Sequence, residues 1–186
     1  MILVIDTSSP SRSAVATIDG EITEELFAPR FGPDELRRLV EGKPVTKVAV
    51  ATGPGSFTGL RVGVSFGLGL AVGLRVPIVP LPSLDLQAAR AVEPVISIVD
   101  AGRGRYYFKV PGEAPALGAP AEIPTSHSLV GNVADHRPLV AAGHHFKPEA
   151  ELRRFVDAAT ILLETAVEVH YRNLEIEYMQ SFSRKG

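Results

Sequence analysis

Two carboxylates stand where a strand-like run gives way to a turn of small residues. Asp6 ends the run Ile2 to Ile5 and is followed by Ser8, while Asp100 ends a similar run and is followed by Gly102. A carboxylate at a strand tip, beside small hydrogen-bonding residues, can position Mg²⁺ and the phosphates of a nucleotide. The same placement suits an aspartate that forms a turn by bonding backbone N–H groups two residues on. Both roles stay open, and these four residues form a candidate nucleotide site.

A glycine-rich stretch, ATGPGSFTGLRVG at residues 51–63, is the second candidate for phosphate binding. A P-loop requires G-x-x-x-x-G-K-[ST], but no lysine occurs between Lys47 and Lys109. A dinucleotide fingerprint fails too, because Thr58 occupies the position of the third glycine. Ser56 lacks the flanking glycines of a G-x-S-x-G nucleophile elbow. We therefore expect this stretch to lead into a helix that Ser56 caps.

Composition excludes several other kinds of chemistry. The 186 residues include no cysteine, which removes disulfides, thiolate metal sites and thiol nucleophiles. The five histidines form no H-E-x-x-H motif, so no metal site is expected. A net charge of −2 gives no global basic field for nucleic acid. The first residues do not resemble a signal peptide, and no membrane segment is expected, so the sequence predicts a cytoplasmic protein.

The candidate residues must be positioned by alternating strands and helices. Strands are expected at 2–5, 13–18, 21–28, 47–51 and 77–81, and helices at 33–40, 57–74 and 83–92, the last capped by Ser83. A strand, a crossover helix and the next strand run parallel with a right-handed connection. The first half therefore predicts an α/β unit, in which helices cover a mixed sheet.

The second half repeats the plan of the first, which indicates a duplicated fold. From Pro94 the order strand, aspartate, small-residue turn and strand recurs, so that Asp100 aligns with Asp6 and Gly102 with Ser8. Residues 111–138 are rich in proline, glycine, alanine and serine and predict only short strands. A strand at 138–143 and a helix at 148–169 follow. We expect two lobes, at 1–93 and 94–186, the second of them reduced.

The helix at 57–74 carries small residues at a regular spacing. Gly59, Gly63, Gly67 and Ala71 recur every four residues, Leu60, Val64, Leu68 and Val72 form an adjoining apolar ridge, and Gly69 and Gly73 form a second small-residue row. Each interior glycine costs about 0.5–1 kcal/mol of helix stability relative to alanine, so a compensating contact is expected. Packing on the chain's own sheet would supply one. Because the helix is apolar nearly all round, we expect it to be buried on two sides, one against the sheet and one against a partner.

Three segments together resemble the TsaB (YeaZ) family: ILVIDTS near the start, ATGPGSFTGLRVG before the glycine-striped helix, and VDAGRGRYYF at the start of the second half. The resemblance implies a two-lobed fold of the actin, sugar-kinase and Hsp70 (ASKHA) type. It also implies a non-catalytic protein without a cofactor, in which Asp6, Ser8, Asp100 and Gly102 are a vestigial nucleotide site.

The same resemblance implies partners. Members of the family pair with the related enzyme TsaD in making threonylcarbamoyladenosine, next to the anticodon of tRNAs that read codons beginning with A. An ATPase, TsaE, joins the pair, tRNA is contacted through the complex, and the chain alone is expected to form a homodimer. TsaD carries a His-x-x-x-His iron site in its first helix, whereas residues 34–42 of this chain contain no histidine.

The resemblance places the pairing surface on two helices of the first lobe. The residues expected there are Leu36, Leu39, Leu60, Gly63, Val64, Gly67, Leu68 and Ala71. The alternative function is a small Mg²⁺-dependent ATPase or phosphotransferase that uses Asp6 and Asp100. Binding of ATP by the isolated chain would distinguish that enzyme from the scaffold.

Overall fold

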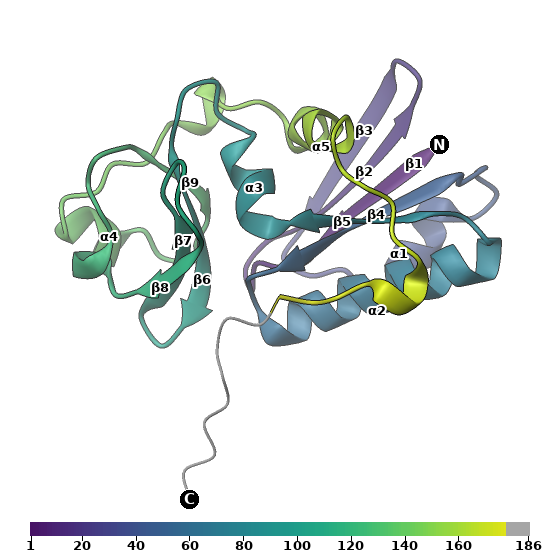
Figure 1. The fold of residues 1–186 in the computed structure, drawn as a ribbon, viewed down its shortest axis with the longest axis horizontal. Coiled ribbons are helices and arrows are strands. Elements are labelled where there is room, and N and C mark those ends of the chain that lie inside the picture. Colours follow the sequence, from purple (N-terminus) through teal and green to yellow (C-terminus); the bar gives the residue numbers. More distant parts are fainter. Residues whose placement is uncertain (178–186) are drawn as a thin grey trace, which may run out of the picture.

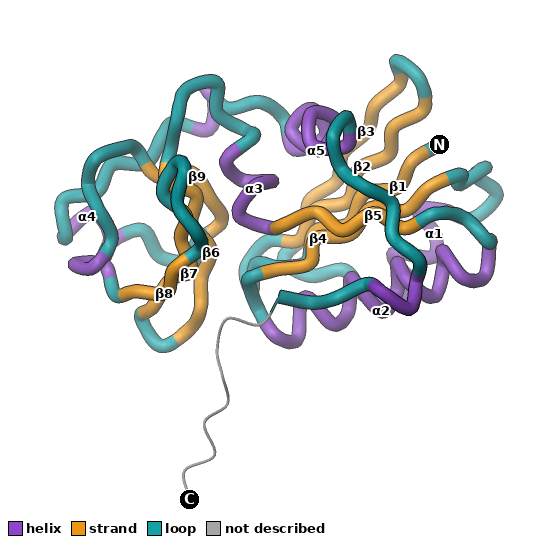
Figure 2. Tube along the Cα trace, viewed as in Figure 1, coloured by secondary structure: helices purple, strands orange, loops and turns teal. Residues whose placement is uncertain are grey.

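The strands of the chain form two separate sheets. The structure, a computed structural model, describes residues 1–177 (Figures 1 and 2). The first sheet has the order β3-β2-β1-β4-β5 and contains β1 (Ile2–Asp6), β2 (Ser13–Asp19), β3 (Ile22–Ala28), β4 (Lys47–Gly53) and β5 (Ile78–Pro82). β1 is antiparallel to β2 and parallel to β4, and β4 is parallel to β5. This is the mixed sheet that the strand and helix order predicts.

Helices cover both faces of the first sheet. Successive residues of a strand point to opposite faces, so each central strand contributes apolar side chains to both. On one face, Ile5 and Val50 pack with residues of α1 (Pro33–Val40) and α2 (Phe57–Leu74). On the other face, Val4 and Ala49 pack with residues of α3 (Ser83–Ala88) and α5 (Phe155–Leu163). The two hydrophobic clusters give the lobe a helix–sheet–helix arrangement (Figure 1).

The second sheet repeats the pairing of the first with fewer strands. It has the order β8-β7-β6-β9 and contains β6 (Ile96–Gly102), β7 (Arg105–Lys109), β8 (Ala116–Gly118) and β9 (Leu129–Asn132). β6 is antiparallel to β7 and parallel to β9, as β1 is to β2 and β4. Within the described part of the chain, this sheet has no counterpart of β5. The duplication predicted from the two aspartates thus extends to the sheet topology.

The chain returns to the first lobe after the second sheet. Phe155 and Val156 of α5 pack against the first sheet, and the strap at 164–177 then crosses the β5 side of that sheet. The Val169 N–H donates to the Ile78 carbonyl at 2.9 Å, and the Glu177 N–H donates to the Thr52 carbonyl at 2.8 Å. The prediction that all of 94–186 forms the second lobe is therefore wrong for 155–177, and residues 178–186 lie outside the described range. Helix α3 has only six residues, so the apolar side chains of α5 complete the cover of this face.

Two predicted elements of the second half, and one of the first, differ from the structure. Residues 137–141 form helix α4 (Arg137–Ala141) where a strand was expected. The helix expected at 148–169 is reduced to α5, preceded by the 3₁₀ turn η2 (Glu149–Glu151), and a further 3₁₀ turn, η1 (Pro120–Glu122), precedes β9. A short apolar run fits either a strand or a helix, which explains the error at α4. Helix α3 ends at Ala88, four residues before the predicted end.

Candidate functional site

Asp6, the first candidate ligand, is buried and forms a turn. Its Oδ1 accepts a hydrogen bond from the Ser8 backbone N–H at 2.8 Å. Burial raises the pKa of the Asp6 carboxyl, and the hydrogen bonds from Ser8 oppose that rise in pKa only in part. The bond from the N–H two residues on is the contact of a turn-forming aspartate, so the geometry of Asp6 favours that role.

The turn after β1 packs directly on the glycine-rich stretch. The Ser56 N–H donates to the Ser8 carbonyl at 2.6 Å, and the Thr7 hydroxyl donates to the Gly59 carbonyl at 2.7 Å. A Cβ placed at Gly55 would lie 2.5 Å from the Ser8 carbonyl oxygen, and one at Gly59 would lie 2.0 Å from the Thr7 carbonyl oxygen. Glycine is thus required at both positions by the chain's own turn rather than by a phosphate.

Two serines were expected to cap helices, and the prediction is correct for one and wrong for the other. The Ser56 hydroxyl accepts from the Gly59 N–H at 3.2 Å and caps α2, as expected. Ser83 does not cap α3, because its hydroxyl accepts instead from the Gly53 N–H at 3.0 Å. Ser83 therefore ties the start of α3 to the end of β4.

Asp100 occupies the equivalent position in the second sheet. Its Oδ2 accepts from the Ala134 N–H at 2.7 Å, and partial burial raises the pKa of the carboxyl. Gly102 is exposed in the β6–β7 hairpin with a φ of +82°, a conformation that glycine adopts without strain. Across residues 1–177, no three His, Asp or Glu side chains lie together as metal ligands. A vestigial nucleotide site at Asp6, Ser8, Asp100 and Gly102 stays a prediction.

The predicted pairing residues of α1 and α2 lie inside the first lobe. Leu36, Leu60, Gly63, Val64, Gly67 and Ala71 are buried, and Leu39 and Leu68 are partly buried against the same core. A Cβ at Gly63 would lie 2.2 Å from Thr7 Oγ1, and one at Gly67 would lie 2.3 Å from Val50 Cγ1. For the six buried residues the assignment to a partner surface is wrong, because Gly63 and Gly67, which we name the inner row, let α2 approach its own sheet. For the partly buried Leu39 and Leu68 it stays a prediction.

The second small-residue row of α2 faces outward. We name Ser65, Gly69 and Gly73 the outer row; all three are exposed, and a Cβ added at Gly69 or Gly73 would meet no atom within 4 Å. Val72 and Leu74 beside it are 47% and 48% exposed. The sequence shows this row, but its spacing alone does not tell which row faces the sheet.

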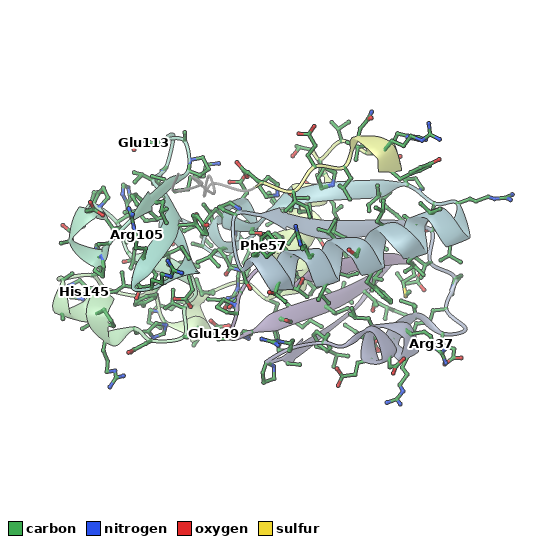
Figure 3. All side chains as sticks on the ribbon, turned by 90° about the horizontal axis from the view of Figure 1, so that it is seen from below. Arg37, Phe57, Arg105, Glu113, His145 and Glu149 are labelled. Carbon is green, nitrogen blue, oxygen red and sulfur yellow. The ribbon has the colours of Figure 1, made fainter. Side chains whose placement is uncertain are left out.

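An open concavity of about 530 Å³ lies at the amino-terminal end of the same helix. Its lining residues are Phe57, Thr58, Arg61, Val62, Ser65 and Phe66. The Arg61 guanidinium stacks on the Phe57 ring at 3.8 Å. Figure 3 shows Phe57 at the end of α2 that lies nearest the second lobe. The concavity and the outer row make one side of α2 an apolar surface with small residues along it.

Among residues 1–177, α2 is the one helix long and apolar enough to cross a membrane by length and composition. A core helix of a soluble protein meets the same criteria. In this structure the inner side of α2 packs along β1 and β4.

Comparisons with known proteins agree with the architecture. Residues 39–120 match the family model described as TsaD, tRNA N6-adenosine threonylcarbamoyltransferase. The chain is 30% identical over 122 residues to the tRNA threonylcarbamoyladenosine biosynthesis protein TsaB of Haemophilus influenzae, a match that covers 58% of this chain and 52% of that protein. It is 46% identical over 66 residues to TsaB of Bacillus subtilis, covering 34% of this chain and 29% of that protein. The chain thus spans about half, or less, of the length of these curated TsaB relatives.

Solved structures support the fold over nearly the whole chain. YeaZ from Pseudomonas aeruginosa matches with a TM-score of 0.71 at 18% identity, covering 96% of this chain and 99% of that chain. A second structure, described as an uncharacterized protein with similarity to peptidase YeaZ from Pseudomonas aeruginosa, matches with a TM-score of 0.74 at 21% identity, with the same coverage.

The two sheets of similar topology, with Asp6 near the end of β1 and Asp100 near the end of β6, and the likeness to the YeaZ structures show a fold of the actin-like ASKHA type. The chain is similar in sequence to curated TsaB proteins and in fold to YeaZ.

Proposed function

We propose that this chain is a non-catalytic subunit in the biosynthesis of threonylcarbamoyladenosine in tRNA, and that it pairs with a TsaD-like catalytic subunit through the outer face of α2. A TsaE-like ATPase joins this pair, and tRNA is contacted through the complex. The names of the curated relatives support the pathway. The observation that carries the pairing surface is the exposed outer row with open space above Gly69 and Gly73.

The energetics of α2 support a partner on that face. Each interior glycine costs about 0.5–1 kcal/mol relative to alanine. Contacts with the turn after β1 and with β4 compensate for Gly63 and Gly67, whereas no contact within the described residues compensates for Gly69 and Gly73. Small residues let a second helix approach closely, because the distance between packed helix axes depends on the side chains at the contact. In isolation a second copy of the chain occupies the same face and forms a homodimer.

Substitution of the outer row tests the pairing surface. Gly69→Leu and Gly73→Leu are expected to abolish co-purification with a TsaD-type subunit and to convert the isolated chain to a monomer in sedimentation experiments. Both positions are exposed, so the circular dichroism spectrum stays close to wild type and the midpoint of thermal unfolding does not fall. Glu164→Leu, which adds an exposed leucine just after α5 on the opposite face of the sheet, is the matched control and keeps pairing. Normal pairing and normal tRNA modification by both outer-row variants would rule out this surface.

Reconstitution tests the non-catalytic role. We expect modified tRNA to form only when a TsaD-type subunit is present, and to form faster with this chain added. The alternative Mg²⁺-dependent phosphotransferase predicts saturable binding of ATP and Mg²⁺ by the isolated chain, lost in Asp6→Ala. Such binding, with the variant still folded, would favour that alternative.

A further inference from the structure

A small cavity lies between α3 and the second sheet, away from the surfaces described above. It has a volume of about 150 Å³ and is lined by Asp85 and Ala88 of α3, Glu93 to Val95, Ser97 of β6, and Lys109 to Pro111 at the end of β7. Ser97 lies near the start of β6, whereas Asp100 lies towards the other end of the strand. The cavity is therefore distinct from the predicted nucleotide site.

Ser97 is an unusual residue for its position in the sheet. Its neighbours Ile96 and Ile98, and Val99 beyond them, are apolar and buried, and Ser97 itself is fully buried. The Ser97 hydroxyl has no hydrogen-bond partner among the described residues. A buried hydroxyl without a partner destabilises a fold, so a polar occupant of the cavity would compensate for it.

A pair of opposite charges stands beside this hydroxyl. Lys109 is the cross-strand neighbour of Ser97, and its Nζ donates to Asp85 Oδ1 at 2.6 Å. Both side chains of the pair are about one-third exposed, at 30% and 32%. The Lys109 ammonium carries three donors and the Asp85 carboxylate two acceptor oxygens, so one bond between them leaves donors and acceptors for a ligand.

A zwitterion is the ligand that complements such a pair. Its carboxylate accepts from Lys109 while its ammonium donates to Asp85. The volume limits the size of the ligand: at roughly 30 Å³ of liquid volume for each water, the cavity holds the equivalent of about five waters. A free α-amino acid with a small side chain is of this size.

We propose that this cavity binds a free α-amino acid with a small, hydroxyl-bearing side chain, held by Lys109 and Asp85 and selected by Ser97. The two charged groups fix the backbone atoms of the amino acid. Ser97 pairs with the side-chain hydroxyl, which an apolar side chain of the same length cannot offer. This inference does not depend on the proposed function, because the cavity and the outer face of α2 share no residues.

Titration of the full-length chain with L-serine tests the proposal. We expect saturable shifts of the backbone amide signals of Ser97, Lys109 and Val110 in NMR spectra at millimolar serine. L-Alanine tests the hydroxyl, ethanolamine lacks the carboxylate and acetate lacks the ammonium, and each is expected to bind at least about tenfold more weakly than serine. Equal affinity for serine and acetate would overturn the zwitterion site.

Variants identify the groups that bind. Lys109→Met and Asp85→Asn are each expected to weaken serine binding about tenfold or more. Arg137→Gln is the control, because it breaks an exposed ion pair with Asp135 elsewhere in the same lobe and leaves serine affinity unchanged. Unchanged serine affinity in folded Lys109→Met overturns the proposal.

Ser97→Ala provides a test that does not disturb the ion pair. The hydroxyl has no partner to lose, so this variant is expected to fold at least as stably as wild type. It is expected to bind serine and alanine equally. If it retains the preference for serine, or if wild type shows no saturable shift with serine at these amides, the site is refuted.

Discussion

Two of the glycines in helix α2, Gly67 and Gly69, lie two positions apart in the sequence but have opposite surroundings. A Cβ at Gly67 would lie 2.3 Å from Val50 Cγ1 and 3.3 Å from Val48 Cγ1, whereas one at Gly69 would meet nothing within 4 Å. Alanine at either position gains about the same helix propensity. The pair Gly67→Ala and Gly69→Ala therefore isolates the cost of crowding the sheet.

The magnitudes follow from these distances. Gly69→Ala is expected to raise the free energy of unfolding by about 0.5–1 kcal/mol, since only the glycine penalty is removed. At Gly67 the new methyl group would lie more than 1 Å inside ordinary contact with Val50, which is fully buried and cannot move freely. Overpacking of this kind costs about 1–3 kcal/mol, and a displacement this large belongs at the upper end. After the propensity gain, Gly67→Ala is expected to lose about 2 kcal/mol.

Thermal unfolding followed by circular dichroism measures the difference. For a chain of this size, 1 kcal/mol shifts the midpoint by about 2–4 °C, so Gly69→Ala gains about 1–4 °C and Gly67→Ala loses about 4–8 °C. Low protein concentration keeps self-association from contributing to the midpoint of Gly69→Ala. Midpoints that move in the same direction for both variants would refute the assignment of an inner and an outer row.

Three further outcomes concern stability. Asp6→Asn is expected to raise the free energy of unfolding at neutral pH and to flatten its pH dependence. Burial raises the pKa of Asp6 above 3.8 in the folded chain, so wild type loses stability as the pH rises from 3.8 through the folded pKa. A variant with an unchanged pH profile in urea titrations would contradict this. Arg90→Met is expected to lose about 1–3 kcal/mol in the same assay, because the buried guanidinium bonds the Glu149 carboxylate and the Arg153 carbonyl; full stability would show that these bonds contribute nothing. Ser56→Ala is expected to lose about 1 kcal/mol through the lost cap of α2, whereas Ser65→Ala on the outer row removes no cap and is expected to lose no stability.

The first lobe was predictable because its elements are long and regular. The bounds expected for α1 and α2, 33–40 and 57–74, are those of the structure, and each expected strand of this lobe is present. The second half was less predictable, since its short runs carry too few residues to show a period. The return of α5 to the first sheet left no local signal, because it depends on contacts such as Phe155 with the cluster around Val4.

The candidate site was also predictable only in part. Sequence showed that α2 has more apolar surface than one sheet can cover, and it showed both small-residue rows. Each row repeats every four residues, so the pattern does not fix the rotation of the helix about its axis. That rotation is set by Thr7 and Val50, which occupy the space that side chains at Gly63 and Gly67 would need. The assignment of the inner row to a partner failed for this reason.

The return of the chain to its first sheet has a consequence for the order in which the protein is made. The core around Val4 and Ala49 is completed by Phe155 and Val156, and the edge at Ile78 is bonded by Val169. A ribosome delivers the amino-terminal strands first, so the first sheet emerges long before the helix and strap that cover it. The second sheet, by contrast, is formed by one continuous segment from β6 to β9. In the sequence this segment stands between α3 and α5, which both belong to the first lobe. During synthesis the second lobe can therefore close first, and the lobe that begins the chain is the last to be finished.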